Sequence, residues 1–529
     1  MRTFTLLALA LWLTFGLTTK VHAQYPEWDD PNSLPKWMTP EEELRKHEIG
    51  LGFLPTSVPG GPVSNIAEFE RMEAVLIRYP LGISLSLVAA MSQHVVVLTI
   101  VANQSTQTQA TNAFQSAGVN MANVQFLVAG TNSYWTRDYG PWFIANGDDE
   151  IAIVDFPYNR PRPLDNAING HVANFMNVPL FGMNVVHTGG NYMTDGFGIS
   201  ASTDLVWEEN GNNQSWVLQQ MQNYLGIDTY HVTMDPLGDY IKHIDCWAKF
   251  LDVDKILITE VPSSHPRYWA YEQIADYYAN QISAYGTPYQ VYRVYSPNGQ
   301  PYTNSLILNH RVYVPIMNST HDAPALAVYQ EAMPGYEVLG FTGSWQSTDA
   351  LHCRTKGIAD KGMLRISHLP LTGIHEYQPH FEIEAEIIPY SGAALYADSL
   401  FLIYSANQGT FDTVMMSHVT NHTYAGLLPV SLGDTIVSYY ISAADHSGRK
   451  ETFPLIGPAG ARSFEVIQTV LPGDANCDGL INVIDVIATV NSILGNNPEP
   501  FCPENADVNG DGVINVIDVV GTVNIILGG

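Results

Sequence analysis

The chain has 529 residues, 46% of them hydrophobic, which is enough for several domains with apolar cores. Its formal net charge of −29 at pH 7 is spread along the chain, and no basic cluster interrupts it. This balance argues against nucleic acid and anionic membranes as partners, and it favours a soluble protein.

Residues 1–23 have the features of a cleaved signal peptide. Arg2 precedes an apolar run from Leu6 to Leu17, and the small-residue site Val21-His22-Ala23 precedes Gln24. About a dozen apolar residues are too few to span a bilayer, and no other stretch is longer. We therefore expect an exported protein, secreted or associated with the cell surface, without a membrane span.

A lead-in rich in proline, tryptophan and charge, residues 24–61, precedes a region of alternating strands and helices. The apolar patterns predict strands at 74–78, 95–101 and 151–155, and helices at 106–117 and 269–284. After about residue 374 the helical pattern stops. Period-two alternation at 380–387, 400–405 and 435–442 then predicts an all-β sandwich of immunoglobulin-like type at 375–468, with no catalytic cluster in it.

Five stretches within the first of these regions carry residues suited to chemistry. They are Tyr134–Phe143, His187–Asn191, Lys242–Trp247, Tyr302–Leu306 and Ala350–Gly357. In the first, Arg137 and Asp138 lie between Trp135 and Trp142. A carboxylate between two aromatic rings can hold a flat cation by its edge while the rings cover its faces. The alternative is a plain turn in which Asp138 pairs with Arg137.

Together and in this order, the five stretches resemble the bacterial (Porphyromonas-type) peptidylarginine deiminases, relatives of the agmatine deiminases. The resemblance extends over roughly residues 24–368 and continues into the β region. It implies a pentein fold at 24–374, an α/β propeller of five ββαβ-type units around a central channel. The alternation of strands and helices alone would suggest a parallel sheet instead.

Hydrolysis of a guanidinium requires carboxylates for the cation, a thiolate, a proton donor and a base for water. The stretch 242–247 is predicted as a strand, whose alternation sends His243 and Asp245 to one face and Cys246 to the other. His243 is then the general acid and base, and Asp245 joins Asp138 in holding the guanidinium. No cofactor is needed for these steps.

The same alternation makes Cys246 a small buried residue and leaves Cys353 as the nucleophile. The resemblance agrees on Cys353 and adds Asn304 as a polar auxiliary residue. His352, next to Cys353, would point away on an extended segment. Gly189, Gly190 and Asn191 fit a tight turn, either lining the channel or purely structural.

Arg160 and Arg162 alternate with prolines in Asn159–Pro163, which presents them on a stiff segment. A solvated loop would explain them. The resemblance implies a clamp for the carboxylate of a C-terminal arginine, with Tyr240 as a third contact and Trp135 beside the guanidinium.

The last 60 residues contain a duplication: residues 474–495 and 507–528 match at 16 of 22 positions. Each copy places oxygen-bearing side chains at positions 1, 3, 5, 9 and 12 of a loop with glycine at position 6, the pattern of calcium loops. The predicted ligands are Asp474, Asn476, Asp478, Asn482 and Asp485, and Asp507, Asn509, Asp511, Asn515 and Asp518. Two solvated acidic turns are the alternative.

One predicted helix follows each loop and none precedes it, so that residues 469–529 resemble a dockerin. Dockerins that bind cohesins carry small polar residues at loop positions ten and eleven, whereas both copies here have Val-Ile. A cohesin-like partner, a cell-surface partner and a calcium-stabilised cap therefore stay open. Cys477 and Cys502 are the natural disulfide of an exported chain.

These patterns predict an exported peptidylarginine deiminase that acts on arginine in peptides or proteins. An agmatine deiminase-like enzyme would share both acids, the histidine and the cysteine. A non-catalytic calcium-organised adhesin would explain the β region and the tail but would leave the site residues without a role.

Overall fold

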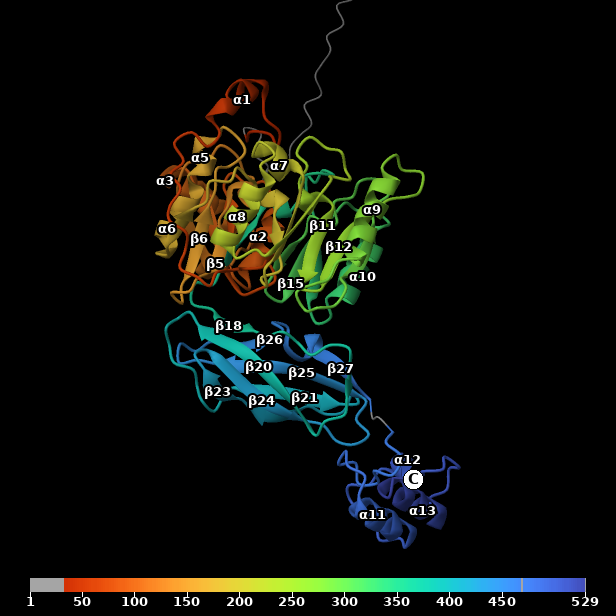
Figure 1. The fold of residues 1–529 in the computed structure, drawn as a ribbon. Helices are drawn as coiled ribbons and strands as arrows, with labels where there is room; N and C mark the ends of the chain where they lie inside the picture. Colours follow the sequence, from red (N-terminus) through yellow and green to blue (C-terminus); the bar gives the residue numbers. More distant parts are fainter. Residues whose placement is uncertain (1–32, 468–469, 529) are drawn as a thin grey trace, which may run out of the picture.

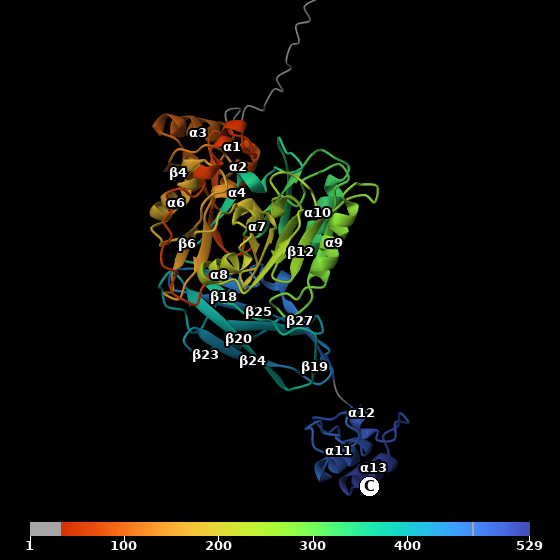
Figure 2. The same ribbon diagram turned by 45° about the horizontal axis from the view of Figure 1, so that its top comes forward.

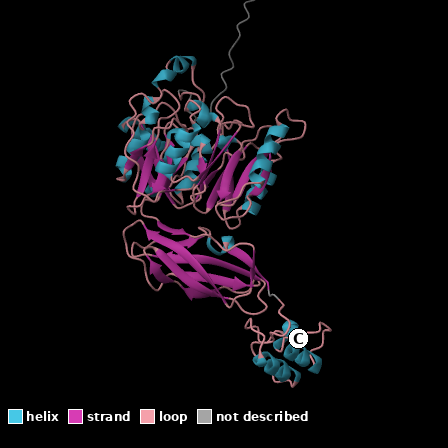
Figure 3. Cartoon of the chain, viewed as in Figure 1, coloured by secondary structure: helices cyan, strands magenta, loops and turns pink. Residues whose placement is uncertain are grey.

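The computed structural model describes residues 33–467 and 470–528 (Figure 1). The predicted signal peptide lies outside these residues. Within them, no helix combines the length and apolar content that crossing a membrane requires. Three regions follow one another along the chain: mixed helices and strands, then strands almost alone, then the helical tail (Figure 3).

Five small mixed sheets make up the first region among the described residues. Their strand orders are β17-β2-β3-β4, β1-β5-β6-β7, β8-β9-β10, β11-β12-β13 and β14-β15-β16. Every sheet combines an antiparallel pair with a parallel strand that is reached through one or more helices. Parallel neighbours need such a crossover, so the helices cover the outer faces. A single parallel sheet, as alternation alone suggested, is not formed.

The strands of these sheets are β1 (Ser64–Asn65), β2 (Met72–Arg78), β3 (Val96–Val101), β4 (Val124–Val128), β5 (Trp142–Ala145), β6 (Ile151–Asp155), β7 (Leu180–Gly182), β8 (Met193–Thr194), β9 (Ile199–Thr203), β10 (Thr229–Thr233), β11 (Ala248–Asp252), β12 (Lys255–Glu260), β13 (Gln290–Tyr295), β14 (Leu306–Leu308), β15 (Arg311–Ile316), β16 (Glu337–Thr342) and β17 (Lys356–Ala359). The longer helices are α2 (Leu85–Ser92), α3 (Gln104–Ser116), α6 (Ile168–Met176), α8 (Gln214–Leu225), α9 (Tyr268–Ala279) and α10 (Asp322–Ala332). The three predicted strands are thereby confirmed. Helix α9 ends five residues before the predicted 284, because Ser283 and Thr287 close a hydrogen-bonded turn there.

Two sheets face each other in the second region and share one apolar core (Figures 1 and 2). One has the order β18-β20-β24-β23, and the other β19-β27-β25-β21-β22 with β26 beside β25. Their bounds are β18 (Leu364–Ser367), β19 (Ile374–Glu376), β20 (His380–Pro389), β21 (Phe401–Ala406), β22 (Asp412–Met415), β23 (Ser417–Thr420), β24 (Thr423–Pro429), β25 (Ile436–Ala444), β26 (Lys450–Phe453) and β27 (Arg462–Ile467). Strand β18 precedes the boundary predicted after residue 374 yet pairs with β20.

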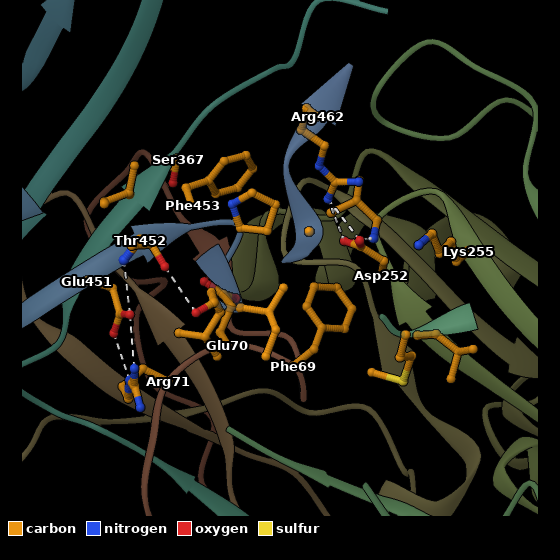
Figure 4. A pocket seen from close by; sticks show the side chains of 18 of the residues that line it. Phe69, Glu70, Arg71, Asp252, Lys255, Ser367, Glu451, Thr452, Phe453 and Arg462 are labelled. Atoms are coloured by element: carbon orange, nitrogen blue, oxygen red, sulfur yellow. Dashed lines mark hydrogen bonds and ion pairs between the residues drawn. The ribbon is translucent and has the colours of Figure 1, made fainter. Parts of the chain in front are cut away.

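Partly buried ion pairs join the two regions. Arg462 contacts the carboxylate of Asp252 at 2.8 Å, and Arg71 contacts Glu451 at 2.7 Å, each pair linking β-region and first-region residues. Figure 4 shows both pairs on the walls of a cavity of about 100 Å³ between the regions, with Phe453 beside them. Their side chains are 11–27% exposed, so water screens these pairs only in part and the contacts help to hold the two regions together.

The tail consists of α11 (Val483–Ile493), α12 (Pro503–Ala506) and α13 (Val516–Ile526), with α11 packed on α13. Asn482 and Asn515 cap the two long helices, and Asp485 and Asp518 complete the capping boxes. The predicted disulfide between Cys477 and Cys502 is confirmed.

Candidate active site

Four short helical turns meet at the predicted site: α4 (Thr136–Tyr139), η3 (Gly189–Asn191), η4 (Ile244–Cys246) and η5 (His352–Arg354). They carry Asp138, Asp245 and Cys353, and His243 directly precedes η4. Each turn lies directly before a strand of a different sheet, namely β5, β8, β11 and β17, and Asn304 lies just before β14. Turn α4 contacts η3 and η5, and η3 contacts η4. The five sheets therefore bring their strand-entry segments together at one place.

Cys353 lies on η5 against Asn304. The amide nitrogen of Asn304 is 3.3 Å from Cys353 Sγ, and its oxygen accepts the backbone N–H of Cys353 at 3.3 Å. A hydrogen bond from Cys246 lowers the pKa of the Cys353 thiol, but burial and the negative charges of Asp245 and Asp349 outweigh it, so this pKa is raised. The sulfur is thus held in a fixed position, and it needs a nearby base or cation to ionise.

Cys246 is buried as predicted, but its orientation contradicts the prediction. Residues 244–246 form a 3₁₀ turn instead of a strand, so period-two alternation does not apply to them. The Cys246 thiol contacts Cys353, and its own pKa is raised well above the usual value by this contact, by burial and by Asp245. Cys246 is therefore a hydrogen-bond donor beside the predicted nucleophile, and it does not point away from the site.

His352 also differs from its prediction, because it lies on a helical turn and points into the site. Its Nδ1 is 2.7 Å from Asp245 Oδ2, and its Nε2 is 2.6 Å from Glu68 Oε2. Burial raises the pKa of Asp245, but the hydrogen bond and charge of His352 outweigh it and hold this pKa below its usual value. Asp245 is therefore ionised at neutral pH.

Asp138 and His243 face each other across Gly190. The distance from Asp138 Oδ1 to His243 Nδ1 is 3.5 Å, and a Cβ at Gly190 would lie 2.6 and 2.5 Å from these two atoms. Burial, followed by the charge of Asp245, raises the pKa of Asp138 to about 8, and burial lowers the pKa of His243 to about 4. Both groups are uncharged in the free site at neutral pH, and only glycine fits at position 190.

The two tryptophans have separate surroundings. The Trp135 ring faces the guanidinium of Arg354 at 5.4 Å, and its indole N–H donates to the carbonyl of Leu34 at 3.0 Å. Trp142 stacks on Tyr192 at 4.0 Å between ring centroids and belongs to the core. The rings therefore do not flank Asp138 as a pair.

Arg137 is not the partner of Asp138, so the plain-turn alternative is wrong. Its Nη2 lies 2.8 Å from Glu68 Oε2, and its Nε donates to the carbonyl of Thr355 at 3.1 Å. The Asp138 carboxylate is therefore available to bind a cation from outside the chain.

Arg160 and Arg162 are buried, which contradicts the solvated-loop alternative. Arg162 holds the carboxylate of Glu42 through Nε and Nη2 at 2.7 and 3.1 Å. Arg160 donates to the carbonyl of Lys36 at 3.2 Å, and its Nε has no hydrogen-bond partner among the described residues. Arg162 thus binds a carboxylate in this structure, and that carboxylate belongs to the chain itself.

The segment that supplies Glu42 covers the same area. It contains α1 (Pro40–Leu44), and Glu43 accepts a hydrogen bond from the hydroxyl of Tyr240, which is otherwise half exposed. Burial and Glu43 raise the pKa of Tyr240 to about 12, so it is the proton donor of this pair. Tyr240 and Arg162 therefore each contact a carboxylate of α1.

In the tail, the predicted ligand side chains wrap each loop. Asp474 accepts the backbone N–H groups of Asp478 and Gly479, and Asp485 accepts those of Asn476 and Asn482. Burial, and the like charges of Asp485 and Asp478, raise the pKa of Asp474. Among the described residues no group of three or more His, Cys, Asp and Glu side chains is placed as a metal cluster. The convergence of carboxylates with asparagine oxygens nevertheless fits the donor set that Ca²⁺ prefers.

Glu68 and Glu42 were not singled out in the sequence. Glu68 precedes an apolar strand, where an acidic residue usually marks a solvated strand end, and Glu42 belongs to an acidic helix start. Neither pattern signals a buried contact, because both contacts join segments more than 100 residues apart.

The model of the Porphyromonas-type peptidyl-arginine deiminase family matches residues 66–358, just over half of the chain. The chain belongs to this family. The predicted resemblance is thus confirmed, and the protein is a deiminase that hydrolyses amidine C–N bonds and not a non-catalytic adhesin. A type I dockerin model matches residues 472–524 of the same deiminase.

Relatives of this deiminase include proteins named "Putative agmatine deiminase". One from Legionella pneumophila is 26% identical over 259 residues, which are 44% of this chain and 74% of the relative. Another from Mycoplasma capricolum is 23% identical over 261 residues, covering 41% and 71%.

Solved structures share the fold. The putative arginine deiminase from Porphyromonas gingivalis aligns with a TM-score of 0.51 and 21% identity over 57% of this chain and 99% of the other. The agmatine deiminase of Enterococcus faecalis aligns with a TM-score of 0.50 and 19% identity over 62% and 100%. The first region of this deiminase therefore has a pentein fold.

Proposed function

We propose that this deiminase hydrolyses the guanidinium of arginine in peptides or proteins, preferably at the C-terminus, to citrulline and ammonia. The observation that carries the proposal is the convergence of Asp138, His243, Asp245, Asn304 and Cys353 beside a buried arginine that binds a carboxylate. Hydrolysis of a guanidinium needs the two aspartates, the histidine, the asparagine and the cysteine. Selection of a C-terminal arginine also needs the buried arginine that binds a carboxylate.

Binding begins with the cation between two carboxylates. Asp245 is ionised in the free site, whereas the raised pKa of Asp138 keeps a proton there at neutral pH. The guanidinium displaces that proton, because two ionised carboxylates can then accept its N–H groups. Asp138 and Asp245 thus act as the pair that orients the reacting carbon towards Cys353.

In the first half of the reaction, the Cys353 proton passes to His243 and the thiolate attacks the guanidinium carbon. A carbon–sulfur bond forms, His243 gives the proton to one nitrogen, and ammonia leaves as that carbon–nitrogen bond breaks. In the second half, His243 takes a proton from water, whose oxygen attacks the same carbon. The carbon–sulfur bond breaks, His243 returns its proton to the Cys353 sulfur, and the proton of the added hydroxyl passes to the released ammonia as citrulline leaves.

The carboxylate clamp is the part that selects the substrate. Arg162 grips Glu42 with two nitrogens, the arrangement that a terminal carboxylate would use, so Glu42 stands in for the end of a peptide. We propose that Arg162, Arg160 and Tyr240 bind the substrate carboxylate once α1 moves away, and that Trp135 borders the same entrance.

An agmatine deiminase-like activity is the second candidate, and the names of the relatives favour it. Agmatine has no carboxylate, so it cannot use the clamp. Steady-state kinetics with free arginine, agmatine and peptides with internal or terminal arginine separate the candidates. Activity confined to agmatine would contradict the proposal, and turnover of peptides that end in arginine supports it.

We also propose that the exported chain consists of three domains with different functions. Residues 33 to about 361 form a five-bladed propeller with the site at its centre, about 362–467 an immunoglobulin-like sandwich, and 470–528 a dockerin-like domain that binds Ca²⁺ in its two loops. The dockerin match supports an extracellular location and a cohesin-type or other cell-surface partner for the tail. Secretion into medium of the full chain, but not of a chain lacking residues 1–23, tests the export.

A further inference from the structure

Asp245 is connected to a buried chain of polar side chains that the proposed mechanism does not use. The chain runs from Asp245 through the His352 ring to Glu68, with contacts of 2.7 and 2.6 Å. The side chains of Asp245 and His352 are only 4% and 5% exposed, and that of Glu68 is 17% exposed. Burial, followed by the charge of Arg137, lowers the pKa of His352, whereas Glu68 and the hydrogen bond to Asp245 act to raise it. The geometry decides for the charged form, because both ring nitrogens lie at hydrogen-bond distance from carboxylate oxygens and both can donate only when the ring is the imidazolium.

Glu68 is fixed in its position from several sides. Its carboxylate lies 2.8 Å from Arg137 Nη2 and 2.9 Å from Lys249 Nζ, and it accepts the backbone N–H of Ile307 at 2.9 Å. Burial raises the pKa of Glu68, but the charges of His352, Lys249 and Arg137 outweigh it and hold this pKa well below its usual value. An ionised anchor with three cationic neighbours keeps the His352 ring in one orientation.

The other end of the chain reaches the reaction centre. His352 contacts Oδ2 of Asp245, and the Cys353 sulfur lies 3.6 Å from the same oxygen. The remaining titratable groups that face Asp245 are His243, Lys249, Asp138 and the Cys246 thiol. Asp138 is buried like Asp245 but lacks a comparable donor, and it is the carboxylate whose pKa is raised.

We propose that His352 and Glu68 are positioning residues for the deiminase reaction: Glu68 anchors the His352 ring, and His352 keeps Asp245 ionised and oriented for the substrate guanidinium. This inference rests on the proposed role of Asp245. It explains why two neighbouring buried carboxylates differ in charge: Asp245 is ionised in the free site, and Asp138 becomes ionised when the substrate cation binds.

Counting the protons released on substrate binding tests this proposal. The full chain with Cys353→Ala should bind a peptide ending in arginine without turning it over. Calorimetry of this binding at pH 6.5, in buffers of different ionisation enthalpy, gives the number of protons released per peptide bound. We expect about one proton, from Asp138. Adding His352→Gln removes the charged donor, burial raises the pKa of Asp245, and the release rises towards two. Glu68→Gln should give an intermediate value.

Glu70→Gln is the matched control, because Glu70 lies on the same segment and forms a partly buried ion pair with Arg365 away from the site. It should leave the release at one proton. The same variants with Cys353 intact should show kcat/KM at pH 6 at least tenfold lower for His352→Gln and unchanged for Glu70→Gln.

A release of one proton in both His352→Gln and Glu68→Gln would overturn the positioning role, as would an equal rise in Glu70→Gln. If His352→Gln does not fold, as judged by its melting temperature, Glu68→Gln alone decides. Unchanged peptide binding in Cys353→Ala with Asp245→Asn would instead remove the proposed function of Asp245, so the two failures are distinguishable.

Discussion

At the scale of single residues, the site separates two carboxylates by their hydrogen-bond partners. Asp245 has the His352 ring beside it, and Asp138 has a neutral His243 at 3.5 Å. Burial raises the pKa of both carboxyl groups, but only Asp245 accepts a hydrogen bond strong enough to offset this rise. The pH dependence of the enzyme should follow from this difference.

We expect kcat/KM for arginine substrates to rise about tenfold per pH unit up to about pH 8 and then to level off. Below the Asp138 pKa of about 8, binding of the cation must expel a proton, at a cost of about 1.4 kcal/mol per unit. The raised pKa of Cys353 acts in the same direction. A pH–rate profile measures the slope, and a flat profile between pH 6 and 8 would contradict the assignment.

The two buried thiols should differ in their effect on turnover. Cys353→Ala should abolish activity and labelling by a thiol-directed amidine inhibitor. Cys246→Ala should retain both but require a higher pH, because the hydrogen bond that lowers the Cys353 pKa is lost. Peptide mapping after labelling identifies the modified residue, and a label on Cys246 would reverse the assignment.

At the scale of elements, local periodicity predicted the strands well but misplaced the site residues. The runs at 72–78 and 96–101 are buried strands whose apolar content decides their conformation. The segments 244–246 and 352–354 are 3₁₀ turns, too short for any periodicity, and their conformation depends on contacts with other sheets. His243, Asp245 and Cys353 were therefore identified by their chemistry and the family resemblance, whereas Cys246 and His352 were placed wrongly.

Helix α1 should restrain the enzyme. Because Glu42 occupies Arg162, we expect Glu42→Gln to raise kcat/KM several-fold for peptides ending in arginine and to leave amidated peptides unchanged. The exposed neighbour Glu41→Gln is the control and should change neither. Equal changes on both kinds of peptide would show that Glu42 does not compete with the substrate carboxylate.

At the scale of the whole molecule, the three regions are connected in different ways. Ion pairs such as Arg462–Asp252 and Arg71–Glu451 bind the β region to the first region, and these pairs could not be anticipated from the sequence because they join residues about 200 and 380 positions apart. The tail has its own small core and its own disulfide. Closing the loop between Cys477 and Cys502 stabilises the tail by roughly 3 kcal/mol.

Calcium should therefore act on the tail and not on the reaction. A chelator should lower the melting temperature of the tail, because an ion that binds only the folded loops stabilises them by mass action, and it should leave early deiminase rates intact. Calorimetry and ammonia release measure the two effects. A calcium requirement for turnover in a chain that ends at Ile467 would contradict this separation.

The most direct test of the central claim compares a peptide that ends in arginine with its C-terminally amidated copy. Loss of a charge-assisted contact with Arg162 costs about 1.5–3 kcal/mol, so kcat/KM should be roughly ten- to a hundredfold higher for the free acid, with citrulline as the product. Equal turnover of the two peptides would show that no carboxylate clamp selects the substrate.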